Sequence, residues 1–140
     1  MNPIFQTSKP EGSTTLNTYL FTEKPGELID CLSIVFSAEE ACRNVSDDGL
    51  IIRNCILKIG DTCIVIAQAN GEFMGMRTTL YMYVNDVDSL FKTAVDHGAK
   101  VVFSPEDMDY GDRQGGIVDS TGNYWWISKR LVEGGYKVLC

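Results

Sequence analysis

The sequence has 140 residues, of which 44% are hydrophobic and 22% are charged. This length corresponds to about one domain, and the composition is that of a globular protein rather than a disordered, collagen-like or coiled-coil chain. Twelve Lys and Arg residues against nineteen Asp and Glu residues give a net charge of −7. Because no basic run offsets this charge, we expect binding neither to nucleic acid nor to an anionic membrane.

The N-terminal extension, residues 1–13, carries no continuous apolar stretch, so we expect neither a secretory signal nor a membrane anchor. No apolar stretch approaches the ~20 residues that a membrane-spanning helix needs. The cysteines are odd in number and include no C-x-x-C pair: Cys31, Cys42, Cys55, Cys63 and Cys140. This usage fits reduced thiols, and we expect a cytoplasmic protein.

The first half of the chain predicts a strand, a helix and a hairpin. The strand covers Leu16–Phe21, and the helix begins near Pro25 with one apolar stripe formed by Leu28, Cys31, Leu32, Val35 and Phe36. Strands over Leu50–Ile59 and Thr62–Ala67 then flank the two-residue turn Gly60-Asp61. In this register Cys55 and Cys63 lie on opposite faces, which excludes a disulfide between them.

The second half repeats this order. A strand is expected over Thr79–Val84, and a helix over Val87–His97 that begins at Asp86 and stops at Gly98. Three further strands are expected over Lys100–Phe103, Gln114–Val118 and Asn123–Ser128. The pair Gly115-Gly116 precedes no helix, so it predicts a bend or a close approach within the sheet rather than a phosphate loop.

The repeated pattern predicts an α+β protein built by internal duplication. Two βαβββ modules are expected, residues 14–70 and residues 71–131, together forming one domain. The remaining residues 132–140 form a C-terminal tail, which is either frayed or an added strand at a subunit contact.

A string in the second half carries a family resemblance: Tyr110-Gly111-Asp112-Arg113, followed by Gly115, Asp119, Gly122 and Trp125. With the duplication, it resembles the vicinal oxygen chelate superfamily, and most closely the PhnB-like part of its glyoxalase/bleomycin-resistance branch. The resemblance implies that the two modules form a cupped mixed sheet with the helices outside. It also implies a ligand pocket inside the cup and a homodimer.

Enzymes of that superfamily commonly hold a divalent metal with four inward-facing His, Glu or Gln side chains. The corresponding positions here are Asn17, Val65, Thr79 and Trp126. Val65 and Trp126 cannot ligate a divalent ion, and Asn17 and Thr79 are weak neutral ligands. The single histidine, His97, falls in the last turn of a helix, where a solvent-facing role is expected. We therefore expect no metal and no other cofactor.

Strand alternation places a set of aromatic and polar side chains inside the cup, where they either bind a ligand or fill the cup as core. Arg113 adds either a clamp for a ligand carboxylate or an ion pair with a neighbouring acid. The predicted ligand-binding residues are Asn17, Tyr19, Phe21, Asn54, Thr79, Tyr81, Tyr83, Arg113, Tyr124 and Trp126.

An aromatic wall suits a flat aromatic or a cationic organic molecule. The favoured function is therefore metal-free binding of a small organic ligand. Two alternatives remain open. One is a metal-dependent lyase, isomerase or dioxygenase that uses other ligands, and the other is an interaction module with a filled cup.

Overall fold

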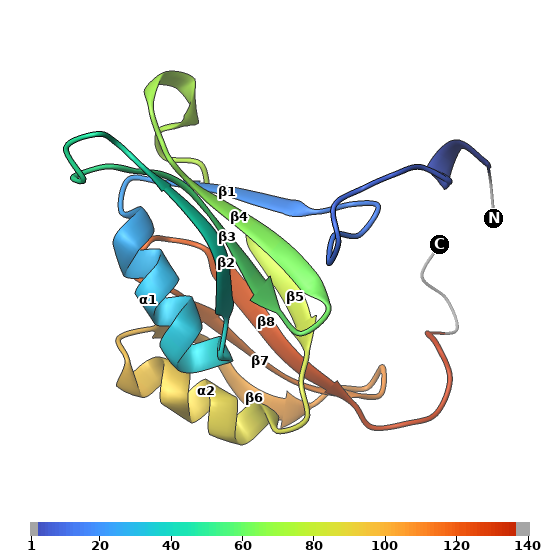
Figure 1. The fold of residues 1–140 in the computed structure, drawn as a ribbon. Coiled ribbons are helices and arrows are strands. Elements are labelled where there is room, and N and C mark those ends of the chain that lie inside the picture. The colour runs from blue at the N-terminus through green and yellow to red at the C-terminus, as the bar shows by residue number, and fades with distance from the viewer. Residues whose placement is uncertain (1–2, 137–140) are drawn as a thin grey trace. The chain divides into compact units, whose positions relative to one another are not determined.

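The computed structural model describes residues 3–136, and the chain divides between Met76 and Arg77 into two compact units. Each unit contains one sheet and one α-helix, and these elements follow each other in the order strand, helix and three strands (Figure 1). The internal duplication and the α+β fold predicted from the sequence are confirmed.

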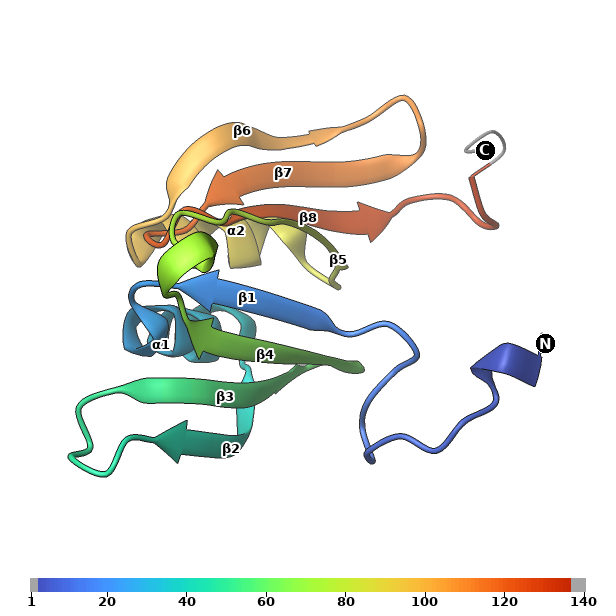
Figure 2. The ribbon, with the colours of Figure 1, turned by 90° about the horizontal axis from the view of Figure 1, so that it is seen from above.

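The first unit forms a four-stranded sheet in the order β1-β4-β3-β2 (Figure 2). β1 pairs with β4 in parallel, and the other pairs are antiparallel. Its elements are the short 3-10 helix η1 (Pro3–Phe5), β1 (Thr18–Thr22), α1 (Pro25–Phe36), β2 (Glu39–Val45), β3 (Ile52–Ile59), β4 (Thr62–Gln68) and the 3-10 helix η2 (Gly71–Phe73).

The second unit has the same topology, with the strand order β5-β8-β7-β6 and a parallel pair β5–β8. Its elements are β5 (Thr79–Tyr83), α2 (Val87–Asp96), β6 (Lys100–Asp107), β7 (Asp112–Val118) and β8 (Tyr124–Arg130). Within the part of the chain that the structure describes, no helix is long and apolar enough to span a membrane.

The hairpin of the first unit has the predicted register, in which Ile59 pairs with Thr62. One face of this hairpin is buried and packs against α1, through Cys55, Leu57, Ile64 and Ile66. Leu28 and Leu32 of α1 are fully buried on the other side of this contact. Leu16 departs from the prediction, because it precedes β1 and is 88% exposed rather than packed on the helix.

In the second unit α2 packs against β6, β7 and β8. The helix begins as predicted, because the carboxylate of Asp86 accepts a hydrogen bond from the Ser89 amide at 3.1 Å. Gly98 then ends it with a φ of 98°, a conformation that a residue without a Cβ adopts at no steric cost. The core beneath α2 contains Ile117, Trp125 and Ile127.

One strand was not predicted. β2 consists of the polar segment Glu39–Val45, all of whose side chains are exposed, so it has no apolar alternation to detect. Cys42, Cys55 and Cys63 carry free thiols, whereas Cys140 lies outside the described residues.

Candidate ligand-binding site

The face of the second sheet that points away from α2, called here the open face, carries an aromatic cluster. In β5 and β8, Thr79 pairs with Tyr124, Tyr81 with Trp126, and Tyr83 with Ser128. These partners share one face because paired residues in a sheet point to the same side. Trp125 and Ile127 point to the opposite face and are buried. The predicted alternation of β5 and β8 is therefore confirmed.

The rings on the open face are partly accessible. Tyr81 and Tyr83 are 46% and 54% exposed, with ring centroids 5.4 Å apart. Trp126 is half-buried and meets Phe103 edge to face, with a centroid distance of 5.3 Å and an interplanar angle of 85°. Tyr124 makes a similar contact with Trp126 at 6.1 Å. The two tyrosines of β5 therefore retain ring surface available for stacking.

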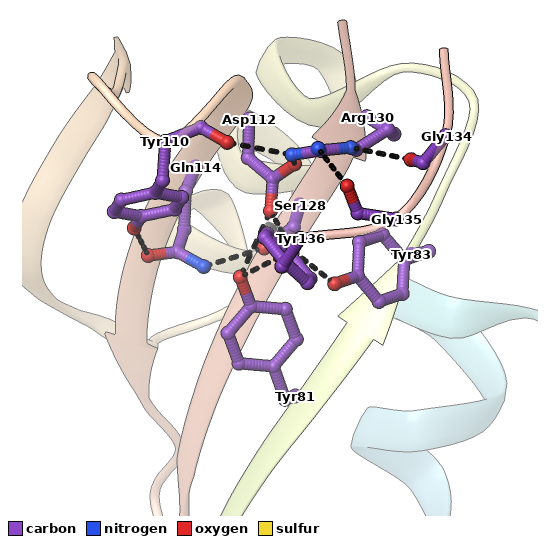
Figure 3. A network of polar contacts seen from close by, with 10 residues as sticks. All are labelled: Tyr81, Tyr83, Tyr110, Asp112, Gln114, Ser128, Arg130, Gly134, Gly135 and Tyr136. Atoms are coloured by element: carbon purple, nitrogen blue, oxygen red, sulfur yellow. Dashed lines mark hydrogen bonds and ion pairs between the residues drawn. The ribbon is translucent and has the colours of Figure 1, made fainter. Parts of the chain in front are cut away.

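A buried carboxylate lies beside these rings (Figure 3). Asp112 of β7 is completely buried, and its Oδ1 accepts a hydrogen bond from Nη1 of Arg130 at 3.0 Å. Its Oδ2 accepts from the hydroxyl of Tyr81 at 3.1 Å and from the hydroxyl of Tyr136. Burial acts to raise the pKa of Asp112, but the donors from Tyr136, Arg130 and Tyr81 outweigh it and lower the pKa below its ordinary value. Asp112 is thus an anion that is paired with a cation.

Arg130 also holds the segment that follows β8. Its Nε donates to the carbonyl of Gly134 at 3.3 Å, and its Nη2 donates to the carbonyl of Gly135 at 3.2 Å. The guanidinium carbon lies 4.4 Å from the ring centroid of Tyr136. The Tyr136 hydroxyl also contacts the hydroxyl of Tyr83 and lies 3.5 Å from that of Tyr81. The tail, whose structure the sequence left open, is therefore folded onto the open face as far as Tyr136 (Figure 3).

A second chain of hydrogen bonds extends across the same face. The hydroxyl of Tyr110 donates to Oε1 of Gln114 at 2.7 Å, and Nε2 of Gln114 donates to Oγ of Ser128 at 2.7 Å. Asp112, Gln114, Arg130 and Tyr136 were not among the predicted site residues. Gln114 could have been found, because alternation along β7 puts it on the same face as Asp112.

Arg113 does not lie on the open face. Alternation along β7 directs it to the helix-covered side, where it binds Asp88 of α2 at 2.8 Å through both Nε and Nη2. Its Nη1 donates to Asp107 at 2.9 Å. The predicted ligand clamp is therefore corrected to the alternative reading, an intramolecular ion pair, because two carboxylates already satisfy the guanidinium.

Of the predicted site residues in the first unit, Tyr19, Phe21 and Asn54 share one face of the sheet, and Asn17 lies outside it. Phe21 stacks on Phe73, with centroids 4.2 Å apart and an interplanar angle of 10°, and Tyr19 lies 5.1 Å from Phe21. Asn54 shares their face, since both Phe21 and Asn54 pair with Ala67. Asn17 is not part of β1, because its amide binds Thr14 in an exposed local turn.

Asp119 and Trp125 of the resemblance motif have structural roles. The carboxylate of Asp119 accepts hydrogen bonds from the Thr121 and Asn123 amides and from Nε1 of Trp125, the last at 2.8 Å. Asp119 thereby ties the β7–β8 turn to the core.

A Cβ added to Gly116 would lie 2.7 Å from Cδ1 of Phe103, which confirms the close approach expected at Gly115-Gly116.

The donor set does not fit the divalent metal that the fold family implies. Val65 and Trp126, at two of the four corresponding positions, have no side-chain atom that ligates such an ion. Within residues 3–136, no three His, Cys, Asp or Glu side chains are grouped so that they could hold a metal. His97 is exposed and bonds through Nδ1 to the carbonyl of Thr93 at 2.9 Å.

No family model matches the chain. The uncharacterized protein Mb0911c of Mycobacterium bovis is 30% identical over 128 residues, which cover 84% of each chain. This chain therefore belongs to the same family as that mycobacterial protein.

Solved structures share the fold at lower identity. TioX from Micromonospora sp. ML1 is 22% identical with a TM-score of 0.67, and the match covers 83% of this chain and 99% of TioX. A glyoxalase/bleomycin resistance protein/dioxygenase family enzyme from Burkholderia phytofirmans PsJN is 19% identical with a TM-score of 0.66, covering 82% of this chain and 97% of that enzyme. The fold is that of the vicinal oxygen chelate superfamily, as the sequence predicted.

Proposed function

We propose that this protein binds a small aromatic or cationic organic molecule on the open face of its second sheet, without a metal ion. The observation that carries the proposal is the exposure of Tyr81 and Tyr83 beside the buried carboxylate of Asp112. Exposed rings offer stacking and cation–π contacts, and a few fixed polar groups give orientation. Tyr19, Phe21 and Asn54 provide a similar surface in the first unit.

The proposed role is sequestration rather than catalysis. The bleomycin resistance in the name of the Burkholderia neighbour fits this role. The donor chemistry at Val65 and Trp126 also favours it over the metal-dependent reactions of the superfamily.

Calorimetric titration with p-cresol, 4-methylanisole and benzyltrimethylammonium tests the proposal. We expect at least one probe to bind, with an affinity that a chelator leaves unchanged. Trp126→Ala should weaken that binding by about 2- to 10-fold, since a stacked aromatic pair contributes ~0.5–1.5 kcal/mol beyond its buried area. Phe5→Leu, which changes an exposed aromatic residue of the first unit, is the control and should have no effect. Failure of all three probes to bind at millimolar concentration, or loss of binding with the chelator, would overturn the proposal.

We also propose a homodimer. Each sheet ends in strands with unpaired edges, β1 and β2 in the first unit and β5 and β6 in the second. Pairing between subunits commonly covers such edges. Sedimentation equilibrium at micromolar concentration should give twice the monomer mass of 15.5 kDa, and the monomer mass alone would exclude the dimer.

A further inference from the structure

The tail places a phenol on the candidate site. The ring and hydroxyl of Tyr136 form the same chemical group that a small phenolic molecule would present. The hydroxyl bonds to Asp112 and to Tyr83, and the guanidinium of Arg130 covers the ring. A ring with one face on a cation and its hydroxyl on a buried carboxylate is held as a bound ligand would be.

The segment that carries Tyr136 has little packing of its own. A Cβ added to Gly134 or Gly135 would meet no atom within 4 Å. The segment is held by the Arg130 hydrogen bonds to Gly134 and Gly135 and by the contacts of Tyr136. Two adjacent glycines lose more conformational entropy on ordering than other residues do. Displacement of this segment would therefore regain chain entropy, and a bound phenol would restore the contacts that the Tyr136 ring and hydroxyl give up.

The charges of Asp112 and Arg130 determine that the hydroxyl bound beside them is a neutral one. Arg130 already neutralises Asp112, so the pair does not require a second cation. Oδ2 of Asp112 accepts one hydrogen bond from Tyr81 and can accept a second, which a neutral hydroxyl supplies and a phenolate or carboxylate does not. In agreement, the hydrogen bond to Asp112, with those of Tyr81 and Tyr83, raises the pKa of Tyr136 and keeps its hydroxyl protonated.

From these contacts we infer that Tyr81, Tyr83, Asp112 and Arg130 form a subsite for a neutral phenol, and that Tyr136 fills this subsite in the free protein. The ligand is a small phenolic molecule that displaces residues 134–136. This inference rests on the proposed function and names the ligand class of the same site.

The test compares p-cresol with 4-methylanisole, which has the same ring but no hydroxyl proton, on the full chain and on Tyr136→Ala. A tail that occupies the subsite nine-tenths of the time lowers the apparent affinity about tenfold. We therefore expect Tyr136→Ala to bind p-cresol about tenfold more tightly than the unaltered protein, and Tyr136→Phe to fall between them. Glu133→Gln, which changes an exposed side chain next to Gly134, is the matched control and should bind p-cresol as the unaltered protein does.

The ligand pair separates this inference from the proposed function. Binding of 4-methylanisole as tightly as p-cresol to Tyr136→Ala would show that the hydroxyl is not recognised and would overturn the phenol subsite. Equal p-cresol affinity in Tyr136→Ala and the unaltered protein would overturn the occupancy by the tail. In either case the proposed function stands if any of the three probes binds, and it falls if none does.

Discussion

Trp125 and Trp126 are neighbours in the chain but face opposite sides of β8. Trp125 is 2% exposed and donates its Nε1 hydrogen to Asp119 at 2.8 Å, within the core under α2. Trp126 is half-buried on the open face, where its ring contacts are with Phe103 and Tyr124. One dipeptide thus contributes separately to the stability of the second unit and to its candidate site.

We expect Trp125→Ala to lower the free energy of unfolding by about 3–5 kcal/mol, because it removes a large buried ring and leaves a cavity. Trp126→Ala should lower it by less, since part of that ring is already in contact with water. Urea denaturation followed by far-UV circular dichroism measures both. Equal losses in the two variants would contradict the assignment of the faces.

Asp119→Ala should destabilise the protein by at least about 3 kcal/mol, because it removes several hydrogen bonds to a charged acceptor, including the one from the indole N–H of the buried Trp125. The control is Asp47→Ala, an exposed acid in the loop between β2 and β3, which should change stability by no more than about 0.5 kcal/mol. Thermal and urea unfolding give both values. A loss at Asp119 no larger than that at Asp47 would show that the turn does not depend on this carboxylate.

The lowered pKa of Asp112 predicts a loss of stability in acid. Its folded pKa lies below its ordinary value of 3.8, so the unfolded chain binds more protons between these two pH values. The stability that the ionised group contributes is therefore present above about pH 4 and is lost as the pH falls through the folded pKa. Asp112→Asn should unfold with a shallower dependence on pH below 4 than the unaltered protein. Identical slopes in urea titrations across this range would refute the prediction.

Thiol reactivity should follow burial. Desolvation raises the pKa of Cys55 to about 11, and this side chain is fully buried, so at pH 8 it is neither ionised nor accessible. Cys42 is exposed on β2. Iodoacetamide followed by peptide mapping should modify Cys42 in the native protein and Cys55 only after denaturation. Rapid native modification of Cys55 would mean that the first unit opens easily.

Periodicity in the sequence was enough to predict most of the fold. Strands whose two faces differ in burial, such as β3 and β5, alternate clearly, and α2 has an N-cap and a terminating glycine at its predicted ends. β2 was not predicted because its side chains are exposed along its whole length. Only its pairing with β3 defines it as a strand. Leu16 was misplaced because an apolar residue just outside a strand looks like part of the alternation.

The candidate site was only partly predictable. Alternation placed Tyr81, Tyr83 and Trp126 on one face, since neighbouring residues of a strand must point to opposite sides. It gave no information on Tyr136, because the tail has no periodicity and its position depends on Arg130 hydrogen bonds between side chain and backbone. For Arg113 the sequence left two roles open, and the ion pair with a neighbouring acid is the one found, with Asp107; its second partner, Asp88, is 25 residues away and no local pattern indicates it.

The close contact between Gly116 and the ring of Phe103 limits how this protein can be engineered. A combinatorial library that seeks new ligand preferences would naturally randomise the open face. Any side chain at position 116 would have to displace the Phe103 ring, which lies against Trp126. Such library members would therefore lose the contact between Phe103 and Trp126 that supports the aromatic cluster. Such a library should randomise Tyr81, Tyr83 and Tyr124 and keep Gly116 and Phe103 constant.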